Sequence, residues 1–158
     1  MNVTLNYGCD GLEVALPDDA DVTVIHKPSM PQVGQAANAV LNALHNPVGA
    51  PPLSELAGSA ASACIAICDI TRPVPNGLFL RPVIEMLLAG GIPADRITVL
   101  VATGLHRPNQ GDELAELVGD PWVLENVRVE NHFARNDEDH VLVGVTATRG
   151  TVARLGRR

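Results

Sequence analysis

Two short polar stretches contain the residues that could do chemistry. Asp69, Thr71 and Arg72 follow an apolar run in ICDITRP, and His106 follows another in ATGLHRP. The Arg72 guanidinium presents a planar fork of donors that matches a carboxylate or a phosphate. The His106 imidazole can take and give a proton near neutral pH. Together the two stretches predict a site that binds a small anion beside an acid–base group.

Residue type alone leaves open which role each of these polar side chains has. Asp69 could orient Arg72 or His106, and Thr71 could donate to a bound anion. Alternatively, Asp69 and Thr71 could cap the helix that follows, Arg72 could be an ordinary surface side chain, and His106 could be an ordinary loop histidine. For the remaining histidines a structural role is favoured: His26, His45, His132 and His140.

Apolar runs precede each polar stretch, and helical segments separate them. ACIAICD and DRITVLVATG predict two buried strands, the first covered on both faces, and NVRVENH predicts a third. NGLFLRPVIEMLLAGG and NQGDELAELVG predict the intervening helices, so the order indicates a right-handed parallel sheet. Ligands of such sheets bind outside the carboxyl ends of the strands. There the residues 69–72, His106 and the pair Asn131-His132 would meet.

The rest of the chain predicts smaller elements. NVTLNYG and GLEVALP indicate an antiparallel hairpin, DVTVIHKP a third short strand, and residues 31–47 and 51–58 two helices. HVLVGVTA indicates a fourth strand of the main sheet, whereas residues 151–158 lack a clear partner strand or helix. The fold class is therefore α/β, a Rossmann-like, mostly parallel sheet flanked by helices, with a small antiparallel N-terminal addition. We assign residues 1–150 to one domain and residues 151–158 to a truncated tail.

Composition narrows the class of protein. A net charge of -7 argues against a nucleic acid or an anionic membrane as partner. No apolar run is long enough to span a bilayer, and the N-terminus lacks the pattern of a signal peptide, so we expect a soluble cytoplasmic protein. Cys9, Cys64 and Cys68 predict free buried thiols, and their spacing fits no common zinc site. G-x-G-x-x-G, P-loop and G-x-S-x-G motifs are absent from the sequence.

Five segments in order carry a family resemblance. LNYG, NPVGAPPLSELA, DITRPVPN, ATGLHRPN and VENH resemble the N-terminal domain of the nickel-pincer lactate racemase family. The similarity extends over residues 2–151, and its most specific part is the combination of DITRPVPN with ATGLHRP. It implies a racemase of 2-hydroxyacids. In that family a nickel-pincer nucleotide accepts the hydride from C2 of the substrate, and histidines move the hydroxyl proton.

The resemblance assigns roles residue by residue. His106 matches one of two acid–base histidines, and Arg72 matches the arginine that binds the substrate carboxylate. Asp69 and Thr71 match polar residues that orient the site or bind the cofactor phosphate. Phe133 departs from the pattern, because the family usually has an acid there. The second acid–base histidine, the cofactor-linked lysine and the nickel-ligating histidine would lie beyond the present sequence, which contributes no metal ligand.

These assignments predict the substrate-side domain of a racemase that is inactive alone. It would be completed by a C-terminal domain or a second polypeptide, and a homodimer could also cover the apolar surface left for that partner. One alternative is a non-enzymatic binding domain for a small carboxylate or phosphate metabolite. A hydrolase using His106 with an external metal ranks below both, since no compact ligand cluster accompanies His106 in the sequence.

Overall fold

The computed structural model describes residues 1–8 and 10–157, which form two compact units, Met1–Gln32 and Val33–Arg158. The first unit contains β1 (Asn2–Leu5) and β2 (Leu12–Ala15), paired antiparallel as predicted. The predicted strand in DVTVIHKP is wrong: residues 21–28 form no strand, since no described segment pairs with them. The prediction for Cys9 lies outside the described residues.

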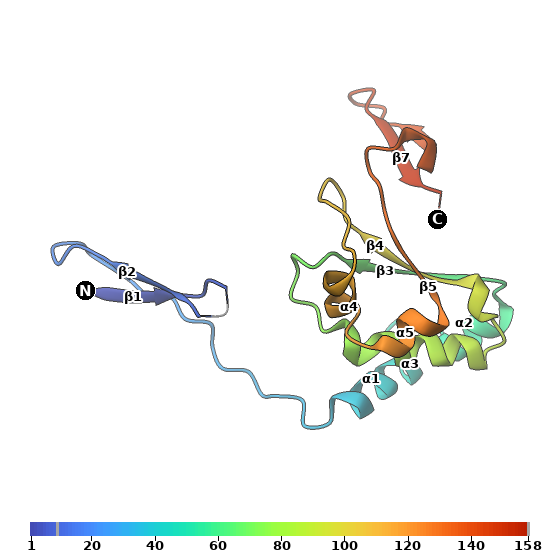
Figure 1. The fold of residues 1–158 in the computed structure, drawn as a ribbon, viewed down its shortest axis with the longest axis horizontal. Coiled ribbons are helices and arrows are strands. Elements are labelled where there is room, and N and C mark those ends of the chain that lie inside the picture. The colour runs from blue at the N-terminus through green and yellow to red at the C-terminus, as the bar shows by residue number, and fades with distance from the viewer. Residues whose placement is uncertain (9, 158) are drawn as a thin grey trace. The chain divides into compact units, whose positions relative to one another are not determined.

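The second unit contains a three-stranded parallel sheet, as the alternation of elements predicts (Figure 1). Its strands are β3 (Ala63–Cys68), β4 (Ile97–Ala102) and β5 (Arg128–Asn131), in that order. The helices are α1 (Ala36–His45), α2 (Leu53–Ser59), α3 (Asn76–Ala89), α4 (Asp112–Val118) and α5 (Pro121–Asn126). The sequence analysis did not predict α5, which begins where the Asp120 side chain accepts a hydrogen bond from Trp122 N at 2.9 Å.

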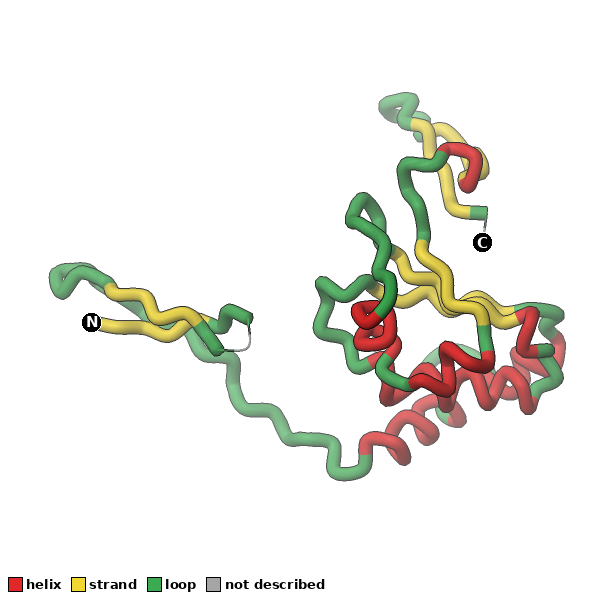
Figure 2. Tube along the Cα trace, in the orientation of Figure 1, coloured by secondary structure: helices red, strands yellow, loops and turns green. Residues whose placement is uncertain are grey.

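The hydrophobic core lies between the sheet and the helices. Figure 1 and Figure 2 show helices α1 to α5 on one side of the strands of the parallel sheet. Alternate strand residues point toward the helices, and apolar helix residues meet them. The fully buried members at the centre of this layer are Leu80, Ile84, Ile97, Val99, Val101, Val118 and Val123. Trp122 packs against the same core.

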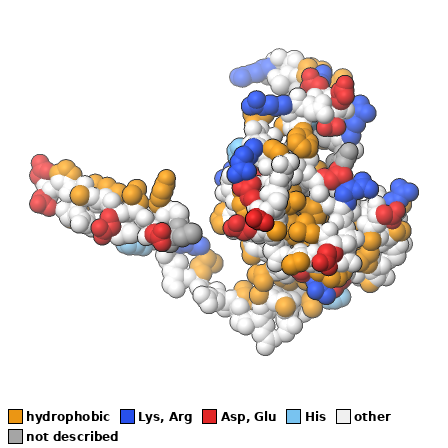
Figure 3. Space-filling view, viewed as in Figure 1, with side chains coloured by type: hydrophobic (Ala, Val, Ile, Leu, Met, Phe, Trp, Pro, Cys, Tyr) orange, Lys and Arg blue, Asp and Glu red, His pale blue; other side chains and the backbone are white. Residues whose placement is uncertain are grey.

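The opposite face of the sheet is not covered by any helix of the described residues. Cys64, Ala66 and Cys68 alternate with the core positions of β3 and are exposed. The predictions that β3 is buried on both faces and that these two thiols are buried are therefore wrong. The run reads as continuously apolar because small Ala and Cys side chains occupy the open positions. Apolar side chains are visible among the charged ones on the surface of this unit (Figure 3).

The last two strands form a separate antiparallel pair. β6 (His140–Val145) pairs with β7 (Val152–Gly156), so β6 is a strand as predicted but does not join the parallel sheet. The prediction that residues 151–158 lack a partner strand is wrong. A turn over residues 146–151 reverses the chain: Gly150 N donates to Thr146 O at 2.9 Å, and Gly150 has a φ of 64°. In the described ranges 1–8 and 10–157, none of the helices combines the length and apolarity that crossing a bilayer requires.

Candidate functional site

The parallel register brings the three predicted polar stretches to one edge of the sheet. Cys68, the last residue of β3, lies opposite Ala102, the last residue of β4. Val101 in turn lies opposite Asn131, the last residue of β5. The loops that contain Asp69 and His106 therefore leave the sheet side by side. This is the edge at which parallel α/β sheets bind ligands.

Asp69 and His106 form a hydrogen-bonded pair at this edge. Asp69 is only 5% exposed, and its Oδ2 lies 2.5 Å from His106 Nδ1. Its second oxygen, Oδ1, accepts a hydrogen bond from Thr71 Oγ1 at 2.6 Å. An ionised carboxylate has no proton to donate, so His106 is the donor through Nδ1, and in the neutral imidazole Nε2 then bears the lone pair. Of the two partners considered for Asp69, the structure selects His106.

The charge state of Asp69 supports this arrangement. The hydrogen bond from Thr71, and then the one from His106, lowers the Asp69 pKa below its ordinary value of 3.8, although burial opposes the shift. Asp69 is therefore ionised at neutral pH and available as an acceptor. Neither Asp69 nor Thr71 caps the next helix, because the N-cap of α3 is Pro75 and no side chain bonds there.

The backbone around His106 is fixed by its neighbours. Gly104 adopts a φ of 57°, a conformation that favours glycine, and His106 N donates to Thr103 O at 3.0 Å. Thr103 is buried, and its hydroxyl donates to the carbonyl of His132 at the end of β5. The loop that contains His106 is thus bonded both to itself and to the adjacent strand end.

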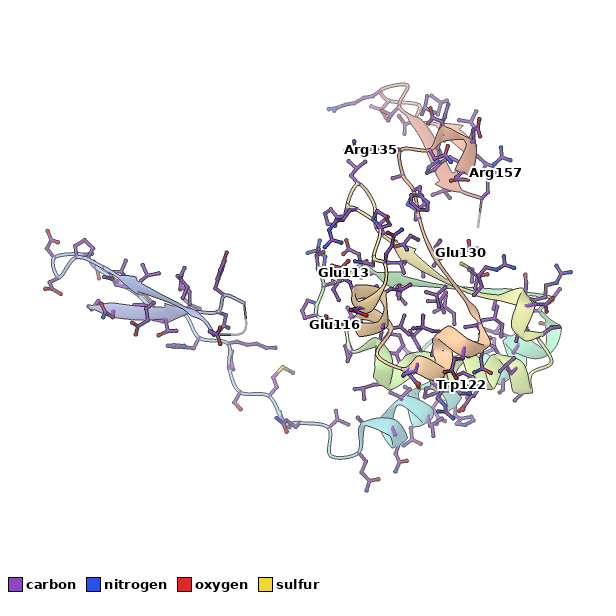
Figure 4. All side chains as sticks on the ribbon, viewed as in Figure 1. Glu113, Glu116, Trp122, Glu130, Arg135 and Arg157 are labelled. Atoms are coloured by element: carbon purple, nitrogen blue, oxygen red, sulfur yellow. The ribbon has the colours of Figure 1, made fainter. Side chains whose placement is uncertain are left out.

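The loops that contain Asp69 and His106 each carry an arginine, and these two arginines differ in their partners. Both terminal nitrogens of Arg107 donate to the carboxylate of Glu113 at 2.6 Å, and this pair lowers the Glu113 pKa and raises the Arg107 pKa. Figure 4 shows Glu113 at the start of α4. Arg72 is exposed, and across residues 1–8 and 10–157 its side chain makes no hydrogen bond or ion pair. Of the two guanidinium groups, that of Arg72 is therefore the one available to an anion.

The two polar residues at the end of the third strand, Asn131 and His132, have partners in different parts of the unit. Asn131 belongs to the Asp69–His106 edge, whereas the His132 ring contacts His140, with the two Nε2 atoms 3.1 Å apart and the rings edge to face. His132 also lines a pocket of about 720 Å³ between β5 and the β6–β7 pair. Neither His106 nor Arg72 lines that pocket. We place the candidate site at the loop pair because the buried carboxylate and the acid–base group lie there.

Sequence reasoning missed Asn109, which is 2% exposed. Its side chain accepts from Ile70 N at 3.3 Å and donates to Glu113 at 2.9 Å. Its backbone N donates to the Asn131 side chain, and its backbone O accepts from the same amide, both at 2.9 Å. The only signal in the sequence was its place four residues before Glu113, inside the segment ATGLHRPN.

The described residues contain no group of three or more His, Cys, Asp or Glu side chains placed to bind a metal ion. The arrangement offers one proton-transfer group, one buried carboxylate that orients it, and one unpaired cation.

Nearly the whole chain is similar to known proteins. The profile of the family described as "Lactate racemase N-terminal domain" matches residues 7–157. Lactate racemase of Lactiplantibacillus plantarum is 34% identical over 111 residues, which are 70% of this chain and 26% of that protein. Lactate racemase of Thermoanaerobacterium thermosaccharolyticum is 29% identical over 151 residues, which are 94% of this chain and 35% of that protein.

Solved structures agree with the sequence comparison. The lactate racemase apoprotein from T. thermosaccharolyticum superimposes with a TM-score of 0.77 and 28% identity, over 99% of this chain and 36% of that chain. A protein from Thermotoga maritima, at 21% identity and a TM-score of 0.51 over 70% of this chain and 24% of its own, shares the fold. The chain thus spans between a quarter and somewhat over a third of the length of these relatives.

Proposed function

The chain belongs to the lactate racemase N-terminal domain family, and we propose that it supplies the proton-transfer and carboxylate-binding wall of a 2-hydroxyacid racemase site. The observation that carries the proposal is the hydrogen bond between Asp69 and His106 Nδ1. A carboxylate in this position fixes the tautomer and leaves Nε2 as the basic nitrogen. Alone among the described histidines, His106 has an acidic side chain as its hydrogen-bond partner.

The geometry supports a proton-transfer role for His106. Nε2 takes the proton of the substrate hydroxyl, and Asp69 stabilises the imidazolium that forms. Arg72, three residues after Asp69 on the same loop, binds the substrate carboxylate through its planar pair of donors. Thr71 donates to Asp69 and thereby keeps the carboxylate ionised. Of the two roles that the resemblance allowed for Asp69 and Thr71, we propose the orienting one rather than contact with a cofactor phosphate.

The family resemblance also implies a nickel-pincer nucleotide. Among the described residues, no group of three or more His, Cys, Asp or Glu side chains is placed to bind a metal ion without the nucleotide's own donors. We propose that the cofactor, and the groups that complete racemisation, are held by a C-terminal domain or a second polypeptide corresponding to the rest of the relatives' length.

The open face of the sheet supports the proposal that a further domain or polypeptide packs against it. Parallel sheets are usually covered on both faces, yet Cys64, Ala66 and Cys68 are exposed here. A homodimer is the other arrangement that would cover this face. In either case we propose that the present chain does not racemise its substrate alone.

A second candidate is a non-enzymatic binding domain, and the exposed, unpaired Arg72 favours it. Calorimetric titration with lactate and with inorganic phosphate tests the anion binding that both candidates require, and it distinguishes a carboxylate site from a phosphate site. The racemase proposal requires that lactate binds and that Arg72→Ala lowers the affinity for lactate by about 10- to 150-fold, the value of one or more charge-assisted hydrogen bonds. Phosphate binding alone would favour the binding domain.

The matched control is Arg96→Ala. Arg96 is also exposed, but it precedes β4 at the opposite end of that strand from His106. Its loss should leave lactate affinity unchanged. Equal loss of affinity in both variants would indicate a general effect of charge and contradict the role of Arg72, and heat from neither anion would contradict both candidates.

A further inference from the structure

We infer that Asn109 is a positioning residue: it fastens the loop that contains His106 to the loop that contains Asp69, and thereby sets which imidazole nitrogen is left for the substrate. The inference rests on the proposed function of His106. Asn109 makes no hydrogen bond to the imidazole itself and acts through the two loops.

The Asn109 side chain joins two loops of the described residues between which the one other hydrogen bond is that of Asp69 with His106. Its Oδ1 accepts from Ile70 N, the residue after Asp69, at 3.3 Å. Its Nδ2 donates to Glu113 at the start of α4 at 2.9 Å. Asn109 follows His106 by three residues, so its position determines where the His106 loop ends. The Asn109 carboxamide thus links the loop that follows β3 to the segment that follows β4.

Asn131 completes the attachment from the third strand. Its side-chain oxygen accepts from Asn109 N and its amide nitrogen donates to Asn109 O, each at 2.9 Å. Because both bonds use the backbone of Asn109, they hold that residue whatever its side chain is. The backbone of Asn109 is therefore fixed by β5, and its side chain is free to fix the other two loops.

The carboxamide suits this position better than any similar side chain. It must accept from a backbone N–H and donate to a carboxylate at the same time. Aspartate would keep the acceptor but place a second negative charge beside Glu113, and alanine would leave Ile70 N and Glu113 without this partner. Asn109 is 2% exposed, so water cannot readily replace the lost bonds.

The test uses the full 158-residue chain and two-bond ¹H–¹⁵N correlation spectra of the histidine rings at pH 8. In the wild type, His106 should be chiefly the Nδ1–H tautomer, because Asp69 accepts that proton. In Asn109→Ala, the Nδ1–H form should lose its predominance and the spectrum should move toward that of a free histidine. Exchange of the Ile70 amide should accelerate by about fivefold to tenfold, the effect of losing one hydrogen bond.

Asn131→Ala gives a second route if Asn109→Ala does not fold. It removes only the two bonds to the Asn109 backbone and should shift the tautomer in the same direction. Asn76→Ala is the matched control. Asn76 is equally buried and donates to Leu117 O at 2.9 Å, so its loss should destabilise the fold but leave the His106 tautomer unchanged.

Two results would overturn the inference. One is a folded Asn109→Ala variant in which His106 keeps the wild-type tautomer. The other is a tautomer shift of the same size in Asn76→Ala, which would show that any destabilisation has this effect. No substrate is present in these spectra, so they can fail while Arg72 still binds lactate, and lactate binding can fail while Asn109 still positions the ring.

Discussion

Gly77→Ala should destabilise the protein even though it replaces glycine by alanine inside a helix. Gly77 is the second residue of α3 and lies against Gly119, the residue that ends α4. A Cβ built on Gly77 would lie 2.8 Å from Gly119 O and 3.1 Å from Gly119 C. These are backbone atoms, so no side chain can turn away, and one helix must move. The contact matters to the site because α3 and α4 follow the loops that contain Asp69 and His106.

The magnitude is the difference between two opposing effects. Alanine is favoured over glycine in a helix by up to about 1 kcal/mol. Forcing an extra carbon into a packed contact costs about 1–3 kcal/mol. We expect a net loss of about 1–2 kcal/mol in the free energy of unfolding, which corresponds to a fall of about 2–8 °C in Tm for a chain of this size. Urea unfolding followed by circular dichroism measures the first quantity, and a thermal scan measures the second.

Gly58→Ala provides the control with the opposite sign. Gly58 lies inside α2, and a Cβ built there meets no atom within 4 Å. This variant should therefore gain up to about 1 kcal/mol of stability. If Gly77→Ala were as stable as the wild type, or if both variants changed stability in the same direction, the reasoning from the Gly77–Gly119 contact would be refuted.

Two further predictions follow from the site and from the open sheet face. The pKa of Asp69 is lowered in the fold. Its contribution to stability is therefore complete above the ordinary value of 3.8 and is lost as the pH falls through the folded pKa. Asp69→Asn should reduce the fall of the unfolding free energy at acid pH, and a pH dependence parallel to that of the wild type would contradict this. Cys64 and Cys68 are exposed, so both should react with a thiol reagent in the native protein, and each Cys→Ser variant should remove one reactive group; a reaction that requires denaturant would contradict the open face.

The sequence predicted the parallel sheet because its signals are local and repeat along the chain. Apolar runs of six residues alternate with helical segments, and the polar residues at their ends identify one edge. Asp69 and His106 could be nominated by residue type alone. That they bond to one another could be proposed as one of two alternatives, since Arg72 was an equally suitable partner for a carboxylate. Only the geometry distinguishes them.

What the sequence could not predict depends on contacts distant along the chain. Ala and Cys fit both a buried and an exposed strand face, so the apolar run of β3 did not reveal which helices were present to cover it. β7 pairs with β6 through a turn whose signal, Gly150, is a single residue. Asn109 joins three loops, and a polar residue within a loop gives no local sign that it is buried. These misses are tertiary in origin, whereas the confirmed elements are local.

The site also resolves an apparent conflict of charge. The proposed function requires a chain with a net charge of -7 to bind an anionic carboxylate next to the ionised Asp69. Both Asp69 oxygens accept a hydrogen bond, one from Thr71 and one from His106, so that charge is buried beneath its own donors. Glu113 is paired with Arg107 and is similarly neutralised. The carboxylate of a substrate would therefore meet Arg72 without an uncompensated acid from either loop, and this requires only local charge, which the total charge of the chain does not determine.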